Sequence, residues 1–443
     1  MAEAGAFDPE LFAEAVRTDE DRPSASAFVG SDETTTAGAG ARWRSPIGTE
    51  ITASLTATRL ESNSAFATLS PQYDASGRID LTQPLLKGFG PATSAALAAA
   101  RREVESAEAS RDDARLATLA GVEGAYWALY AAERNLAVQR LVRDQADAFL
   151  EEARVREGAG LVGPNQVATA RVFLAEQEQA VLDRENELDA TSDALASLIG
   201  RRPAGGETRF RPADEPPRAF PVAPIEELVA RAEGANPALR ALERRVAGLQ
   251  ARARGASWDA LPAVDLVASV GGLGLSGTGR DTPFTDSTWI GRAGVWSDAI
   301  EDALARRYPT WSAGVRVSVP LPLREGRGER DRLRAEVARA EEDLEALRRV
   351  LDEQVRAVWR ELSQSSRRLD LAREGVDASF EQVRIGVLEY RAGRTSAFEL
   401  VRLGADLATA QQRYSQALVR MARATAEMRR LTGEGLAAAE NRS

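Results

Sequence analysis

The stretch that decides the fold is Tyr390-Arg391-Ala392-Gly393-Arg394-Thr395-Ser396, near the start of the segment 389–433. Moved by 233 positions, this segment matches 156–200, where Gly160-Leu161-Val162-Gly163 lies in the corresponding place. The matched pairs are Gly160 with Gly393, Val167 with Leu400, Leu174 with Leu407, Leu198 with Leu431, and Gly200 with Gly433. The same shift holds upstream, so 122–200 and 355–433 are two copies of one unit. A duplicated unit folds as two copies of one design, which predicts two fused halves.

The composition excludes several classes of function. The 443 residues contain no Cys and no His, so thiolate and imidazole ligands, disulfides and a Ser-His-Asp triad are all impossible. We therefore expect no enzyme, no cofactor and no metal site. A net charge of −10, with both signs interspersed, argues against nucleic acid as a partner. No apolar run of about 18 residues occurs, which predicts no transmembrane helix.

Residues 1–48 read as an N-terminal arm that is partly irregular. Its first residues lack a basic region followed by an apolar one, so either the chain is cytoplasmic or its secretory signal lies outside the given sequence. The pattern from Pro9 to Val16 predicts a short helix. The Ser/Thr/Gly/Ala-rich stretch 24–41 predicts an extended or loosely ordered segment.

Four strands are expected, two in each half. In 51–58 every odd residue is apolar and every even one carries a hydroxyl, and the alternation returns at 79–83, which predicts a β-hairpin over 49–86. The second half has strands at 263–276 and 310–321. The residues expected on the apolar, lipid-facing side are Ile51, Leu55, Val315, Val317 and Val319. Four strands with free edges cannot lie in lipid alone, so other subunits must close the sheet.

Long helices fill the rest of both halves. A helical hairpin is expected over 91–200 with its turn at 158–164, and another over 328–433 with its turn at 391–396. The first repeat therefore spans 49–200 and the second 261–433. A connector with short helices occupies 201–260, and 434–443 is a tail. The first long helix is expected to be five residues longer than the second, and the matched Tyr126 and Trp359 are expected to pack in the helix seams.

This order, strand, strand and long helical hairpin occurring twice, resembles the TolC-like outer-membrane efflux protein family. The motifs that carry the resemblance are Leu81-Thr82-Gln83-Pro84-Leu85-Leu86-Lys87-Gly88-Phe89-Gly90, Ser318-Val319-Pro320-Leu321, Gly160-Leu161-Val162, and 390–396 followed by Leu400. The resemblance implies a mainly α protein with membrane β-strands, a homotrimer whose twelve-stranded β-barrel in the outer membrane continues as a twelve-helix periplasmic tunnel. It further implies a passive exit duct of a tripartite efflux or type I secretion system. The implied partners are outer-membrane lipid, a periplasmic adaptor protein and an inner-membrane RND, ABC or MFS transporter.

The resemblance also assigns roles to the helix turns, which form the periplasmic tip in that family. Adaptor docking falls on Gly160, Leu161, Val162, Gly163, Gly393 and Ser396. The gate or selectivity residues are Glu399, Arg402, Gln166, Thr169, Tyr390, Arg394 and Thr395. The i, i+3 spacing predicts that Arg402 pairs with Glu399 and partly cancels a ring of three carboxylates. Tyr390 is expected either to pack or to donate its hydroxyl to Gln166 across the tip.

Other interpretations are weaker. A soluble coiled-coil scaffold has no use for four two-faced strands, and a periplasmic adaptor would have one helical hairpin between small β domains. Gly272-Leu273-Gly274-Leu275-Ser276-Gly277 fits the dinucleotide-binding pattern, but the following Thr278-Gly279-Arg280-Asp281-Thr282-Pro283 cannot open the helix that the site needs. Strand glycines near a barrel rim account better for this motif.

Overall fold

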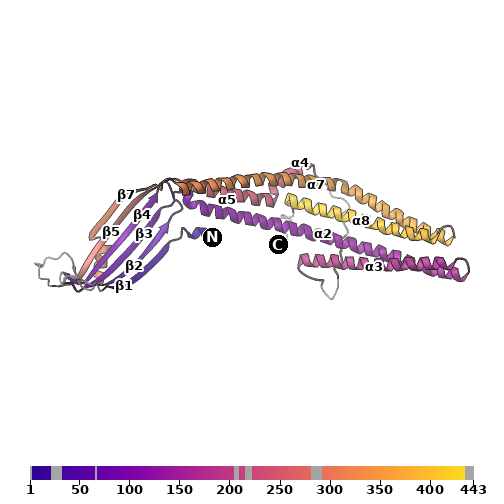
Figure 1. The fold of residues 1–443 in the computed structure, drawn as a ribbon, viewed down its shortest axis with the longest axis horizontal. Helices are drawn as coiled ribbons and strands as arrows, with labels where there is room; N and C mark the ends of the chain where they lie inside the picture. The colour runs from indigo at the N-terminus through magenta and orange to yellow at the C-terminus, as the bar shows by residue number, and fades with distance from the viewer. Residues whose placement is uncertain are drawn as a thin grey trace. The chain divides into compact units, whose positions relative to one another are not determined.

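The computed structural model describes residues 2–20, 32–64, 67–203, 209–214, 222–280 and 292–434. The chain is mainly helical and has one sheet (Figure 1). It divides into two compact units, one of Met1–Glu105 with Glu243–Glu342 and one of Ser106–Leu242 with Asp343–Ser443. Among the described residues, no helix is both long and apolar enough to cross a membrane.

The first unit is built on an antiparallel sheet in the order β1-β2-β3-β4-β5-β7. Its long strands are β1 (Glu10–Glu20), β2 (Asp32–Arg44), β3 (Glu50–Ser62), β4 (Leu69–Pro84), β5 (Ala263–Gly279) and β7 (Tyr308–Ser318). The two-residue β6 (Arg292–Ala293) runs parallel to β5 at Ser276 and Gly277. The hairpin predicted over 49–86 thus contains β3 and β4, while β5 and β7 overlap the strands predicted in the second half.

The helix predicted over 9–16 is wrong, because these residues begin β1. Leu11, Phe12, Ala15 and Val16 have a spacing that also fits a helix face, yet Glu10–Glu20 pairs with β2 along its whole length. The backbone hydrogen-bond partners of β1 lie in residues 32–42. No pattern within residues 9–16 indicates this pairing. The segment 24–41, predicted to be extended or loosely ordered, is an extended strand from Asp32 onward, and its residues 24–31 lie outside the described part of the chain.

The register gives the sheet one apolar and one polar face. Ile51, Leu55, Val315 and Val317 fall on the same face, because the pairings run from Ile51 to Leu81, Ala268 and Ala313 and from there along β7. The opposite face carries Thr52, Ser54, Thr56, Thr58, Asp74, Ser76, Arg78, Asp80, Ser269 and Ser312. Val319 follows the last residue of β7 and is exposed. Such alternation is typical of a sheet between two different environments.

A short helix that the sequence did not predict, α6 (Trp296–Leu304), packs on the apolar face. It contacts β3, β4 and β5, and Ala299 and Ala303 form a buried cluster with Ala57 and Ala75. A Cβ on Gly274 would lie 1.9 Å from the carbonyl oxygen of Ala299. Gly272 and Gly274 of the motif at 272–277 therefore admit the backbone of α6, and Gly277 lies against the backbone of Pro71. Close backbone packing accounts for these glycines without a phosphate ligand.

The helix hairpins make up most of the second unit, while the start of each hairpin belongs to the first unit. Helices α2 (Pro91–Gly158) and α7 (Arg324–Arg391) each have 68 residues, and α3 (Pro164–Ile199) and α8 (Ala397–Thr432) each have 36. The expected five-residue difference between the long helices is therefore wrong. Helix α7 begins earlier than the predicted 328, because Arg324-Glu325-Gly326-Arg327 already forms its first turn. Gly326 allows this turn to lie against the backbone of Ala260.

The remaining helices are α1 (Ala2–Gly5), α4 (Ile225–Ala235) and α5 (Pro237–Asp259). In the first unit, α5 packs closely against the start of α2, where Gly255 faces Ala95 and Arg252 pairs with Glu103 at 2.9 Å. In the second unit, Leu228 and Ala232 of α4 join a buried cluster with α7 and α8.

Candidate functional site

The two helix turns have the same backbone. Gly160 and Gly393 adopt left-handed φ angles of 69° and 71°. In the first turn the amide of Leu161 donates to the carbonyl of Arg156 at 2.9 Å, and in the second Arg394 donates to Glu389 at 2.9 Å. This hydrogen bond from the second residue past the helix defines a Schellman turn, which requires a left-handed residue and hence favours Gly. The turn residues Gly160, Leu161, Gly163, Gly393 and Ser396 are exposed and Val162 is half-buried.

Directly beneath the turns lies a core to which all four long helices contribute. Val142, Ala146, Phe149 and Ala153 come from α2, Val167 and Phe173 from α3, Val383 and Tyr390 from α7, and Leu407 from α8. A cavity of about 390 Å³ opens beside this core, with Phe149, Phe173, Phe380 and Tyr390 in its wall. The two hairpins therefore pack against each other directly beneath their turns.

Tyr390 is part of this core and does not reach across to Gln166. Its side chain is only 3% exposed and its ring meets that of Phe149 edge to face, with centroids 5.0 Å apart. Gln166 is exposed. The Tyr390 hydroxyl is buried without a hydrogen-bond partner among the described residues. Burial is the main cause that raises the pKa of the Tyr390 phenol. Of the two roles expected for Tyr390, packing is the one that the structure shows, and no hydrogen bond to Gln166 forms within one chain.

Arg156, which the sequence did not single out, connects the two hairpins. Its guanidinium donates to the carbonyl oxygens of Tyr390 at 3.2 Å and Arg391 at 3.0 Å, and lies 4.8 Å from the centre of the Tyr390 ring. Glu152, one turn earlier on α2, pairs with it at 3.1 Å. Basic side chains commonly bind the last carbonyls of a helix, where the helix dipole is negative. Here the basic residue, Arg156, lies in the last turn of α2, whereas the carbonyls that it binds lie at the end of α7.

The second turn carries an ion pair where the first carries neutral residues. The guanidinium of Arg402 pairs with the carboxylate of Glu399 one turn away, as the spacing predicts, and this hydrogen bond raises the pKa of Arg402. The hydroxyl of Ser396 accepts from the amide of Glu399 at 3.4 Å and caps α8. At the matched positions of α3, Gln166 is exposed and Thr169 donates to the carbonyl of its own helix at Asn165. Arg394 is exposed and Thr395 half-buried.

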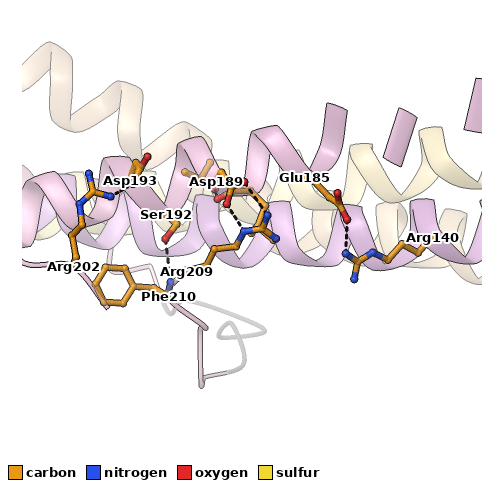
Figure 2. A network of polar contacts seen from close by, with 10 residues as sticks. Arg140, Glu185, Asp189, Ser192, Asp193, Arg202, Arg209 and Phe210 are labelled. Carbon is orange, nitrogen blue, oxygen red and sulfur yellow. Dashed lines mark hydrogen bonds and ion pairs between the residues drawn. The ribbon is translucent and has the colours of Figure 1, made fainter. Parts of the chain in front are cut away.

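Farther from the turns, the connector after α3 is bound to the hairpin by polar contacts (Figure 2). Arg209 forms a two-pronged ion pair with Asp189, and the amide of Phe210 donates to the hydroxyl of Ser192 at 3.0 Å. Nearby, Arg140 of α2 pairs with Glu185 of α3 at 2.6 Å. These contacts hold both α2 and the connector to α3.

The matched aromatics Tyr126 and Trp359 also hold the connector. The Tyr126 hydroxyl accepts from the amides of Ala213 and Asp214, each at 3.1 Å, and the Trp359 indole donates to the carbonyl of Ala223 at 3.2 Å. Both rings also pack on buried clusters, as predicted. Their polar atoms have a second role that the repeat alignment did not reveal. In the described residues, no group of three or more acidic side chains could hold a metal ion.

Comparisons with known proteins agree with this architecture. The family profile described as "Outer membrane efflux protein" matches residues 44–201 and 228–434. No curated protein sequence matches the chain.

Solved structures show a similar fold. The outer-membrane channel OprN is 20% identical with a TM-score of 0.68, over 98% of this chain and 83% of that one. The CmeC outer membrane channel of Campylobacter jejuni is 12% identical with a TM-score of 0.67, over 98% and 79%. The open state of the MtrE outer membrane channel of Neisseria gonorrhoeae is 17% identical with a TM-score of 0.65, over 98% and 82%.

Proposed function

Since the chain belongs to the outer membrane efflux protein family, and is therefore an outer-membrane efflux channel and not an enzyme, we propose how its parts conduct and close. In this proposal three copies form the duct that carries substrates outward from an inner-membrane transporter. A periplasmic adaptor protein joins the two. In the proposal the duct is passive, and the energy for transport comes from the transporter.

The two-faced sheet is the observation that carries the membrane part of the proposal. Outside the area that α6 covers, the residues Ile51, Leu55, Val315 and Val317 of the apolar face, with Val319 just beyond, contact lipid. The hydroxyl and charged residues of the other face line a wet lumen. A single sheet leaves open edges, which hydrocarbon does not tolerate. The open edges therefore require further copies, and we propose that three copies join their sheets into one closed wall.

The helix turns form the periplasmic end of the duct and its gate. The exposed residues of the turns (Gly160, Leu161, Val162, Gly163, Gly393 and Ser396) supply the docking surface for the adaptor. Glu399 lines the constriction, where three copies form a carboxylate ring that Arg402 partly neutralises. Arg156 holds the second hairpin closed against the first through the carbonyls of Tyr390 and Arg391. Opening then requires these contacts to break. Gln166, Thr169, Arg394 and Thr395 complete the gate region.

A soluble coiled-coil scaffold is not favoured. Long helix hairpins alone would suit such a scaffold, but the sheet leaves Trp311, Val315 and Val317 exposed along β7. A soluble protein has no partner for an apolar strand of this kind.

The first experiment extracts the protein in detergent and measures the mass of the complex. We expect a detergent-dependent assembly with the mass of three 47.6 kDa chains. A monomer or dimer that stays soluble without detergent would contradict the channel.

The second experiment tests the gate by recording conductance in planar bilayers. Arg156→Ala should raise the mean conductance, whereas Glu389→Ala, at the matched exposed position of α7, should leave it unchanged. An equal response of the two variants would contradict the role of Arg156 as the closing contact.

A further inference from the structure

The sheet ends in two long strands whose outer edges are unpaired within the described residues. Strand β1 pairs with β2 only, and β7 pairs with β5 only. Each has 11 residues, and neither register contains a bulge. Natural proteins protect a free edge with a bulge, a very short strand or inward charges, because an open edge binds other strands. Neither edge is protected by a bulge or by a short strand, so both are suited to pair with another chain.

The hairpin of β1 and β2 is continuous with the rest of the sheet. Strand β2 pairs with β3 over 13 residues without interruption. Ala37, Ala39 and Ala41 lie beside Ala57, Leu55 and Ala53 on the apolar face. On the polar face the hydroxyls of Thr36 and Thr58 lie 3.2 Å apart. Both faces of the wall therefore extend to β1, where Leu11 is 83% exposed.

This hairpin adds two strands to the number that the sequence predicted. The family profile begins at residue 44, so β1 and most of β2 lie outside it, and the sequence predicted only the strands that follow. The number of strands in each copy decides which two strands form the edges of its sheet. With four strands per copy the edges would be β3 and β7, whereas six strands place β1 and β7 at the edges.

The two edges also fit one another. Six strands alternate in direction, so β1 of one copy runs antiparallel to β7 of the next, and Glu10 and Ser318 both lie at the end of the sheet next to the start of α2. Pairing the strands end to end sets Leu11 opposite Val317 and Ala13 opposite Val315 on the apolar face. On the polar face Glu10 and Glu14 then flank Arg316 diagonally, an arrangement of opposite charges that favours cross-strand pairing.

We propose that the outer edge of β1 binds the outer edge of β7 of a second copy of this chain. This contact rests on the trimeric exit duct proposed above. Three copies of the six long strands then close an eighteen-stranded wall. Walls of about 16 to 18 strands leave an aqueous channel. The N-terminal hairpin is thus a structural part of the pore that widens it.

Disulfide cross-linking tests this contact, because the chain has no Cys of its own. Ala13→Cys is combined with Ala313→Cys, Val315→Cys or Val317→Cys, which covers the even-numbered shifts that keep both apolar faces aligned. Oxidised membranes should give dimers and trimers on a non-reducing gel for at least one pair. The double variant Ala13→Cys with Ala39→Cys, whose residues are opposed within one chain, should stay monomeric, as should each single variant.

A competing set places the first Cys on β3, as Ala53→Cys or Leu55→Cys, with the same three positions of β7. Trimers from this set would show that β3 is the edge, and would overturn the eighteen-stranded wall while leaving the exit duct intact. A complex with the mass of three chains that cross-links in neither set would overturn the contact in the same way. A monomeric mass in detergent would overturn both proposals.

Discussion

The two helix turns have one backbone and two different sets of side chains. Gly160 and Gly393 have nearly the same φ angle, and both turns close with the same hydrogen bonds. At the matched positions, however, Glu157 of the first turn is replaced by the buried Tyr390, and Arg156 by the exposed Glu389. In the same way Gln166 corresponds to Glu399, and Thr169 to Arg402.

The difference shows how a duplicated unit acquires distinct roles. The shared backbone is maintained by glycines and helix periodicity, which both copies retain. One polar contact between the hairpins arises where the two repeats differ, since Arg156 of the first repeat binds the carbonyl of Tyr390 in the second. Variants at matched positions therefore separate what the turns share from what is particular to each.

The largest effect on stability is expected at the buried member of a matched pair. Tyr390→Ala removes a ring from the common core and should lower the free energy of unfolding by about 3 kcal/mol. Glu157→Ala, at the same place in the first turn, should change it by less than about 0.5 kcal/mol. Thermal unfolding of the detergent complex measures both. Similar losses would mean that the two turns are equally packed.

The next effect is the loss of the contact between the hairpins. Arg156→Ala should cost about 2 kcal/mol, because two carbonyls lose a charged donor and Glu152 loses its partner. Arg156→Lys keeps the charge without the planar fork and should fall between wild type and Ala. Thermal unfolding is again the measurement, with Glu389→Ala as the control. A Lys variant as stable as wild type would show that charge alone is needed.

A smaller and equal effect is expected at the two turn glycines. Gly160→Ala and Gly393→Ala force a Cβ into a left-handed conformation, which should cost about 1 kcal/mol in each turn. Gly158→Ala, where the new Cβ meets no neighbour, should be neutral or slightly stabilising at the end of α2. Thermal unfolding measures both losses of stability. Clearly unequal losses in Gly160→Ala and Gly393→Ala would contradict the conclusion that the two turns have equivalent backbones.

The helix caps offer a smaller contrast. Ser396→Ala removes the hydroxyl that caps α8 and should cost about 0.5 kcal/mol. At the matched position, Gly163 is the N-cap of α3 and has no side chain to accept a hydrogen bond. Gly163→Ser supplies a capping hydroxyl and should stabilise α3 by a few tenths of a kcal/mol. The two variants should move the melting temperature in opposite directions.

The smallest effect on stability belongs to the exposed ion pair, although its effect on conduction should be clear. Arg402→Ala removes a surface pair whose contribution to stability is below about 0.5 kcal/mol. It also leaves the Glu399 carboxylates uncompensated, so reversal potentials in a salt gradient should shift toward cation selectivity. Gln166→Glu should act in the same direction, because Thr169 supplies no countercharge. An unchanged selectivity in both variants would place this ring outside the constriction.

Prediction from sequence succeeded where the signal was local. The turn glycines, the helical stretches and the strict alternation at 51–58 are each visible within a few residues. It failed at β1, whose apolar residues also fit a helix, and at α6, where the spacing of Trp296, Ala299, Ile300 and Ala303 is helical but lies in a segment read as a loop. It missed Arg156 because the carbonyls that Arg156 binds lie more than 230 residues away in the chain.

By itself, the sequence determined the repeat, the helix hairpins with their turns, and the two-faced character of the central strands, because glycine conformation and residue periodicity act over a few neighbouring positions. Only the tertiary structure decided that β1 and β2 extend the sheet, that Tyr390 packs inward and leaves Gln166 exposed, and that Arg156 ties α2 to α7. Each of these depends on partners distant in the chain, and their hydrogen bonds and burial exist only once the chain has brought those partners together.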